Sequence, residues 1–195
     1  MKALLAASTA LALLAAGPAL ANQSGAPATS ASATGASATA ASATGANAAM
    51  NQQNATAAGF VQKAGVSNLF EIESSQVALD KAQSQQVRDF AQQMIQDHQQ
   101  AGQTLKSTLA DAQLQVMPPQ QLDQEHANKV DELQSLQDSA FDRTYEQMQT
   151  QAHEKAIALF GFYAKNGDNA DLRQFAGNLL PTLQQHYEMI RSIGQ

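Results

Sequence analysis

The chain contains no cysteine, and this absence excludes several kinds of structure and chemistry at once. No disulfide can form, so the domain must be stabilised by core packing even in a compartment where disulfides would be allowed. No cysteine nucleophile is available, and no lipid anchor on a processed N-terminal cysteine is expected. Thiol chemistry of every kind is therefore excluded.

Other catalytic signatures are also missing. There is no glycine-rich phosphate loop and no His-Glu-x-x-His metalloprotease motif. His153 and Glu154 begin such a motif, but Ile157 occupies the position of its second histidine. Charged residues make up 14% of the chain, its net charge is -6, and no basic patch is interleaved with aromatic residues. These features argue against nucleic acid and anionic membrane surfaces as partners.

The first residues have the pattern of a secretory signal peptide, which we expect at 1–21. Lys2 supplies the positive charge, residues 3–16 an apolar run, and Gly17-Pro18 a helix break. Ala19-Leu20-Ala21 then gives an A-x-A cleavage site. The apolar run is short for a bilayer, and no later segment is long and apolar enough to span one. We therefore expect an exported protein, periplasmic or secreted after cleavage near Ala21, with no integral membrane span in the mature chain.

Residues 22–58 are rich in Ala, Ser, Thr, Gly and Asn and carry no charge. The interspersed Ser, Thr and Gly oppose a helix, although alanine favours one. Low-complexity segments of this composition cannot bury a core, so a disordered linker is expected here.

Residues 59–195 differ in composition, because charges appear and apolar residues recur at helical spacing. This pattern predicts an all-α domain: a ferritin-like four-helix bundle with a short crossover helix. Ser84 and Ser139 are candidate N-caps, and Pro181 is expected to kink the last helix. Pro118-Pro119 separates the first two helices from the rest. The expected helices are about 60–81, 85–114, 120–136, 140–165 and 169–193.

Four polar residues fall on or near the apolar faces of the four long helices: Glu73, His98, His153 and His186. With about 100° per residue, Leu69, Ile72 and Val77 define the first face, which places Glu73 inside and Glu71 opposite. His98 and His186 lie near the centres of their faces, whereas His153 lies at an edge. Burying an ionisable group is costly unless it is paired or bound to a metal. These four residues are therefore the candidate site.

Depth along the bundle gives a second reason to group them. If the crossover helix returns the chain to its starting end, the fourth helix runs parallel to the second. With a rise of about 1.5 Å per residue, His98 and His153 then lie roughly 22 Å from that end. Glu73 and His186 lie roughly 15 Å from it. All four are predicted to converge within about one and a half turns.

At these residues the chain resembles a bacterial family known as domain of unknown function 4142, whose members are expected to be exported. The resemblance covers residues 60–193 and implies a ferritin-like fold, with no established activity. The stretches that carry it are Asn68-Leu-Phe-Glu-Ile-Glu-Ser-Ser-Gln-Val-Ala-Leu79, Met94-Ile-Gln-Asp-His98, Phe141-Asp-Arg-Thr-Tyr145, His153 with Ala158-Leu-Phe160, and Leu180-Pro-Thr-Leu-Gln-Gln-His186.

One departure from ferritin-like di-iron proteins matters. Those proteins use a Glu from each of two helices and a Glu-x-x-His motif from each of the other two. Here Ile95 and Leu183 occupy the positions three before His98 and His186. Both bridging carboxylates are missing, so a di-iron centre is not expected.

Three hypotheses remain for this exported protein. A non-enzymatic role is favoured, and a role in envelope stress is one idea. In the first, the three imidazoles and the Glu73 carboxylate bind one Zn, Cu or Ni ion, or a small ligand. In the second, the polar cluster only fixes helix packing in a structural or interaction module with an envelope protein partner. A divergent redox enzyme is the third.

Several nearby residues have simpler explanations. Met94, Met148 and Met189 lie near the histidines and could serve as soft Cu(I) ligands, but methionine at helical spacing is typical of core filling. His126 is explained by a contact between the crossover helix and the bundle. Asp97 points about 100° away from His98, which argues against a joint role for the two.

Overall fold

The computed structural model describes residues 47–194, and within that range its regular structure is entirely helical. A short helix at residues 47–55 precedes the five longer ones. These are α2 (Ala57–Lys81), α3 (Gln85–Asp111), α4 (Gln124–Ser135), α5 (Asp138–Asn166) and α6 (Ala170–Ile193). The predicted all-α class is confirmed.

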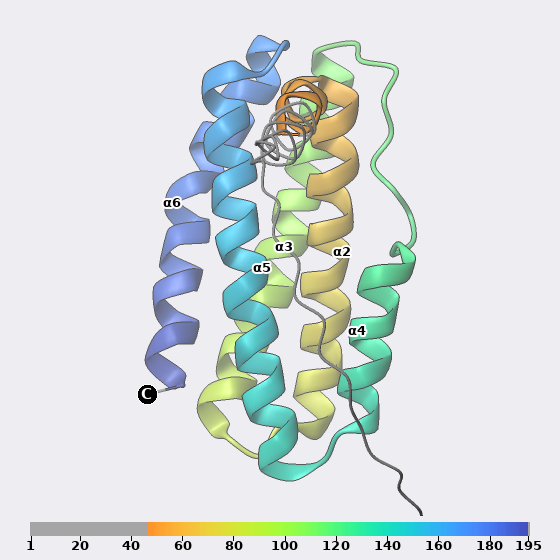
Figure 1. Ribbon diagram of the computed structural model, residues 1–195. Coiled ribbons are helices and arrows are strands. Elements are labelled where there is room, and N and C mark those ends of the chain that lie inside the picture. Colours follow the sequence, from red (N-terminus) through yellow and green to blue (C-terminus); the bar gives the residue numbers. More distant parts are fainter. Residues whose placement is uncertain (1–46, 195) are drawn as a thin grey trace, which may run out of the picture.

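The four long helices form a bundle in which α2, α3, α6 and α5 each contact the next around a ring. After α3, a connection at residues 112–123 runs back along the outside of the bundle, and α4 packs against α2 and α5 (Figure 1). This crossover returns the chain to the end where α3 begins, so α5 runs parallel to α3 (Figure 1). Within residues 47–194, no helix is both long and apolar enough to cross a membrane.

A side chain caps the start of α2, α3, α4 and α6. Ser84 Oγ accepts the backbone N–H of Val87 at the start of α3, as expected. Asn169 Oδ1 does the same for Leu172 at the start of α6. Capping of this kind stabilises a helix because the first N–H groups have no partner within it.

The start of α5 differs from the prediction. Ser139 is not its N-cap, because the helix begins two residues earlier than expected, at Asp138 (φ 53°), with Gln137 in the N-cap position. The reason is that the start of α5 is hydrogen-bonded to the α2–α3 turn. The Asp138 carboxylate accepts from Gln83 Nε2 (2.5 Å), and the Asp142 carboxylate accepts the backbone N–H of Ser84 (2.9 Å). These bonds fix the end of the bundle where α5 begins.

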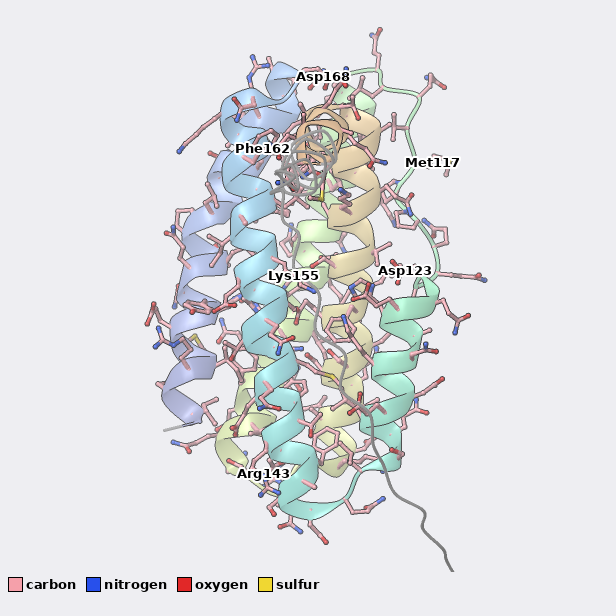
Figure 2. The ribbon with its side chains drawn as sticks, in the orientation of Figure 1. Met117, Asp123, Arg143, Lys155, Phe162 and Asp168 are labelled. Carbon is pink, nitrogen blue, oxygen red and sulfur yellow. The ribbon has the colours of Figure 1, made fainter. Side chains whose placement is uncertain are left out.

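Two boundaries also move relative to the sequence prediction. The expected linker extended to residue 58, but residues 47–55 are helical and α2 begins at Ala57. The backbone N–H of Asp168, at the α5–α6 turn (Figure 2), donates to the Ala55 carbonyl (2.9 Å), which joins this segment to the bundle. A Cβ at Gly59 would lie 2.1 Å from the Gln53 carbonyl oxygen, so the tight turn into α2 requires glycine there.

Residues 1–46 lie outside the described part of the chain, and the expected signal peptide and most of the linker fall there. The connection after α3 is longer than expected because α3 ends at Asp111 and α4 starts only at Gln124, where Asp123 caps it. Asp123 and the exposed Met117 mark this connection in Figure 2.

The core has two apolar clusters with a polar layer between them. The aromatic cluster, near the α5–α6 turn, contains Phe60, Phe160, Tyr163, Leu172 and Phe175 among other residues. The lower cluster, toward the opposite end, contains Val87, Phe90, Met94, Phe141, Tyr145 and Ile190 among others. On α3, α5 and α6 alike, a buried histidine separates the residues of one cluster from those of the other.

Candidate metal centre

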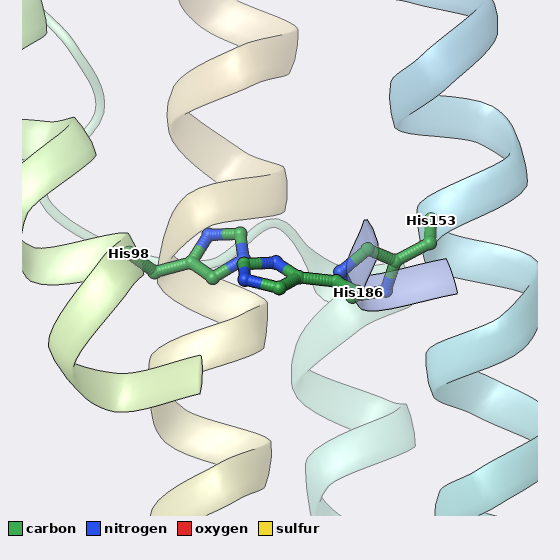
Figure 3. Close-up of side chains that lie close together, drawn as sticks. All are labelled: His98, His153 and His186. Carbon is green, nitrogen blue, oxygen red and sulfur yellow. The ribbon is translucent and has the colours of Figure 1, made fainter. Parts of the chain in front are cut away.

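Three histidines meet in the layer between the two clusters. His98 on α3, His153 on α5 and His186 on α6 are 7%, 1% and 2% exposed. Each has a ring nitrogen within 4.8 Å of a ring nitrogen of the other two. The ring centroids are 6.0 Å apart for His98 and His153, 5.8 Å for His98 and His186, and 5.5 Å for His153 and His186. Figure 3 shows the three side chains directed toward one another. The predicted convergence is confirmed for the histidines.

His153 is fully inside the bundle, not at the edge of a helix face. The buried residues of α5 are spaced three or four apart and form one continuous inward stripe. Gln149 and His153 are its polar members. A face drawn through apolar residues alone leaves these two out, so the predicted face was turned toward Met148 and Ala152. The stripe runs through Phe141, Tyr145, Gln149, His153, Ala156, Phe160 and Tyr163.

One nitrogen of each imidazole is held by a protein oxygen. His98 Nδ1 lies 3.2 Å from Asn68 Oδ1, His153 Nδ1 lies 2.9 Å from the Gln149 carbonyl oxygen, and His186 Nε2 lies 2.9 Å from Asp97 Oδ2. Carbonyl and ionised carboxylate oxygens can only accept hydrogen bonds, so the ring nitrogen must donate in each pair. The proton of each neutral ring is thereby assigned to the nitrogen that faces its oxygen.

The other nitrogen of each ring then carries a lone pair. These atoms are His98 Nε2, His153 Nε2 and His186 Nδ1, and among residues 47–194 none of them has a hydrogen-bond partner. A buried polar atom left unpaired costs about 1–3 kcal/mol. Metal-binding histidines have this arrangement, because a carbonyl or carboxylate orients each ring through its second nitrogen.

The spacing of the rings is close to what one metal ion needs. Bonds of about 2.0–2.1 Å to nitrogen in tetrahedral geometry place the ligand nitrogens about 3.4 Å apart. One nitrogen of each ring lies within 4.8 Å of one nitrogen of each of the other two. Small movements of the side chains would therefore be enough to bring all three into coordination.

Burial keeps the three imidazoles neutral. It lowers the pKa of His98 well below its usual value, and the neighbouring histidines lower it further. Burial also lowers the pKa of His153 to about 4 and that of His186 below its usual value, although Asp97 opposes the shift at His186. Neutral rings present their lone pairs at pH 7 without losing a proton first.

On α2, the carboxyl group beside the histidines is that of Glu71, not Glu73. Glu71 is 1% exposed, and its Oε1 lies 3.9 Å from His153 Nδ1. Glu73 is only partly buried and does not belong to the histidine group. Burial raises the pKa of Glu71 to about 8, against the lowering effect of Gln149. The prediction that Glu73 faces inward and Glu71 outward is therefore wrong.

The reason lies in the composition of α2. After Phe70, its buried side is made of small and polar residues, among them Ser74, Ser75 and Ala78, all fully buried. Leu69 and Ile72, which defined the predicted face, are only partly buried. A helix that uses serine and glutamate to face the core gives hydrophobic periodicity no signal for its orientation.

A polar seam continues from the histidines along the α2–α5 interface. Gln149 Nε2 donates to Ser74 Oγ (3.0 Å), and Ser75 Oγ and Tyr145 Oη share a hydrogen bond of 2.8 Å. Burial raises the pKa of Tyr145 well above its usual value, so the phenol stays protonated. The seam joins the two helices through side-chain hydrogen bonds that are themselves buried.

Sequence reasoning missed the two side chains that orient the rings, Asn68 and Asp97. Asp97 was judged only against His98, its neighbour in sequence, whereas it binds His186 on the adjacent helix. A search for polar residues flanking the predicted site on facing helices would have found both.

The remaining sequence predictions fall outside the centre. Met94 is buried in the lower cluster, and Met148 and Met189 pack against it, as core filling predicts. The ring of His126 lies 5.3 Å from that of Phe70, which is the expected contact between α4 and the bundle.

Comparison with known proteins places the fold in context. The sequence matches the model of a family described as Domain of unknown function (DUF4142) over residues 26–193. Among curated proteins, no sequence matches the chain. A solved structure titled "CopM in the Cu(II)-bound form" is similar with a TM-score of 0.58 and 17% identity, covering 70% of this chain and 94% of that one. At this identity the similarity establishes a shared helical fold.

Proposed function

We propose, for a chain that belongs to the family described as Domain of unknown function (DUF4142), that it binds one divalent transition-metal ion through His98, His153 and His186. The protein contributes three neutral imidazoles from three helices. Asn68, Asp97 and the Gln149 carbonyl position them from behind.

The observation that carries this proposal is the pairing pattern of the rings. Each ring has one nitrogen hydrogen-bonded to an oxygen and one buried nitrogen without a partner in the described chain. If the cluster served only to lock the packing, three lone pairs would stay unpaired at about 1–3 kcal/mol each. A metal ion satisfies all three at once, so the cost of the layer is offset when the ion binds.

The donor set favours late first-row metals. Imidazole nitrogen suits copper, zinc and nickel, and for a given site Cu(II) binds most tightly in the divalent series. The similar structure is titled as a Cu(II)-bound form, which adds a reason to test that ion first. We therefore expect Cu(II) to bind more tightly than Zn(II) or Ni(II).

We assign the protein a binding role and no catalytic residue. Together with the expected signal peptide at 1–21, the centre supports an exported protein that binds or buffers metal ions outside the cytoplasm. A secretion assay on the full chain, with N-terminal sequencing of the exported product, tests the compartment independently of the metal.

The test of metal binding uses tag-free, chelator-treated protein titrated with Cu(II), Zn(II) and Ni(II) by calorimetry. One ion per chain is expected, with binding lost in His98→Leu/His186→Leu. The matched control is His126→Leu, because His126 lies outside the centre and should leave the affinity unchanged. No uptake of any of the three ions at micromolar concentration overturns the proposal.

A second candidate is a structural or interaction module, and the α2–α5 seam favours it because its hydrogen bonds need no ligand. It predicts that His98→Leu/His186→Leu stays folded and still complements the phenotype of a strain that lacks the protein. Under the metal proposal the same variant stays folded and does not complement that phenotype. A deletion strain complemented with each form separates the two.

A further inference from the structure

A cavity of about 300 Å³ adjoins the histidine layer. His98 and His186 both line it, and these two residues carry partnerless nitrogens. The rest of its wall comes from α2, α3, α5 and α6, and from Pro118 and Pro119 in the connection between α3 and α4. The cavity and the candidate metal centre are therefore one continuous feature of the bundle.

Small residues create this space. Ala101 and Gly102 on α3 and Ala156 on α5 stand where larger side chains would fill the bundle. A Cβ at Gly102 would lie 3.1 Å from Asn68 Nδ2, so glycine there also leaves room for the amide that holds His98. The cavity therefore results from small residues at these positions, and it lies beside Asn68, which orients the ring of His98.

The rest of the wall is mainly apolar. Its large apolar side chains include those of Leu69, Ile72, Leu105, Phe160, Leu179 and Leu183. Pockets with apolar walls and a few convergent polar groups are typical of small-ligand sites, and a volume near 300 Å³ is at the lower end of their range. The occupant should therefore be small and largely apolar.

A metal ion held by three histidines keeps a fourth coordination position for another ligand. In this protein the fourth protein donor expected from the sequence, Glu73, is not in the layer. The cavity reaches two of the three histidines, so it offers a route to that position. Ions that prefer imidazole also accept a further nitrogen or sulfur donor.

We propose that the cavity binds a small organic molecule with one nitrogen or sulfur donor and a short apolar tail, the donor completing the coordination of the metal and the tail packing on the cavity wall. This inference rests on the proposed function, because the donor has no partner without the ion. It makes the centre a receptor for a metal–ligand pair, whereas the proposed function alone requires only the ion.

The test compares two probes that share one donor and differ in tail length. Metal content is measured first, and Cu(II)-loaded protein is then titrated with 1-methylimidazole and with 1-butylimidazole while the visible and EPR spectra of the copper are followed. Both probes should change the copper spectrum. The butyl compound should bind at least about tenfold more tightly, because its three additional methylenes are buried against the wall.

A cavity-filling variant shows where the tail lies. Ala101→Leu occupies the cavity and should abolish the preference for 1-butylimidazole while copper still binds one ion per chain. Ala110→Leu is the matched control, because Ala110 is exposed on the same helix and does not line the cavity.

The two proposals fail in different ways. Copper binding with equal affinity for the two probes, or a tail preference that survives Ala101→Leu, overturns this inference and leaves the metal site standing. Failure of the wild-type protein to bind copper, zinc or nickel overturns both.

Discussion

The aromatic cluster and the histidine layer are both buried, but they satisfy their side chains in opposite ways. In the cluster, the ring of Phe60 stacks on that of Tyr163 at 4.1 Å and meets the edge of Phe160 at 5.1 Å. The one polar atom at its rim, Tyr163 Oη, donates to Asp168. In the layer, three imidazole nitrogens and one oxygen of Glu71 have no hydrogen-bond partner within residues 47–194. The aromatic cluster stabilises the fold, whereas the unpaired groups of the histidine layer cost stability.

A cavity-forming substitution in the aromatic cluster should have the largest effect on stability and almost none on metal affinity. Phe60→Ala removes a buried ring from the centre of the aromatic contacts and should lower the free energy of unfolding by about 3–5 kcal/mol. Urea denaturation measures the loss, and a copper titration of the folded variant should match the wild type. If the variant does not fold, Phe60→Leu makes the same comparison with a smaller loss. A fall in copper affinity equal to that of a histidine variant would remove the distinction between the two regions.

Removing a side chain that orients one of the three histidines should lower metal affinity and leave the stability of the fold almost unchanged. Asp97→Ala removes the carboxylate that holds His186 and should reduce copper affinity about 10- to 100-fold. Asp97 is partly exposed, so the free energy of unfolding of the metal-free protein should change little. Competition with a chelator of known affinity measures the effect, and Asp89→Ala, an exposed change on the same helix, is the control. Equal affinities for the two variants would contradict the positioning role.

The stability of the metal-free protein should depend on pH through Glu71. Its pKa is about 8 in the folded chain against a usual value of 4.5, so folding favours the protonated acid. The resulting stabilisation is complete below pH 4.5 and is lost as the pH rises through 8. The lowered histidine pKa values act below pH 6.5, where protonation of the unfolded chain reduces stability. The window from 6.5 to 8 therefore reports on Glu71 alone among these groups.

Across that window the wild-type protein should lose roughly 2 kcal/mol. Glu71→Gln should remove the slope, because the amide does not titrate, and Glu73→Gln should keep it, because Glu73 is outside the layer. Urea denaturation at pH 6.5 and pH 8 gives the comparison. A slope that disappears in Glu73→Gln but persists in Glu71→Gln would reverse our assignment of the inward carboxyl group.

The seam should contribute the smallest measurable effect. Tyr145→Phe removes the partner of Ser75 Oγ and should cost about 1 kcal/mol of stability. Tyr187→Phe is the control, because the hydrogen bond of Tyr187 to Glu154 is exposed. Denaturation midpoints distinguish them, and an equal loss in both variants would show that burial adds nothing to the seam.

Hydrophobic spacing predicted the helices because apolar residues recur at helical spacing along the buried sides of α3 and α6, and along α5 with two polar interruptions. His98 and His186 could be placed because their neighbours on those buried sides are large and apolar. Glu71 could not be placed, since serine and alanine surround it on the inward side of α2. Asn68 and Asp97 escaped for a different reason: they act across helix interfaces, and only the packing of α2 and α6 against α3 reveals the pairs.

The most direct measurement is a calorimetric Cu(II) titration of chelator-treated wild-type protein beside His98→Leu/His186→Leu. Our account predicts one ion per chain for the wild type and no binding by the variant, which should remain folded and be at least as stable as metal-free wild type. Absence of binding by the wild type, or equal binding by both proteins, would contradict it.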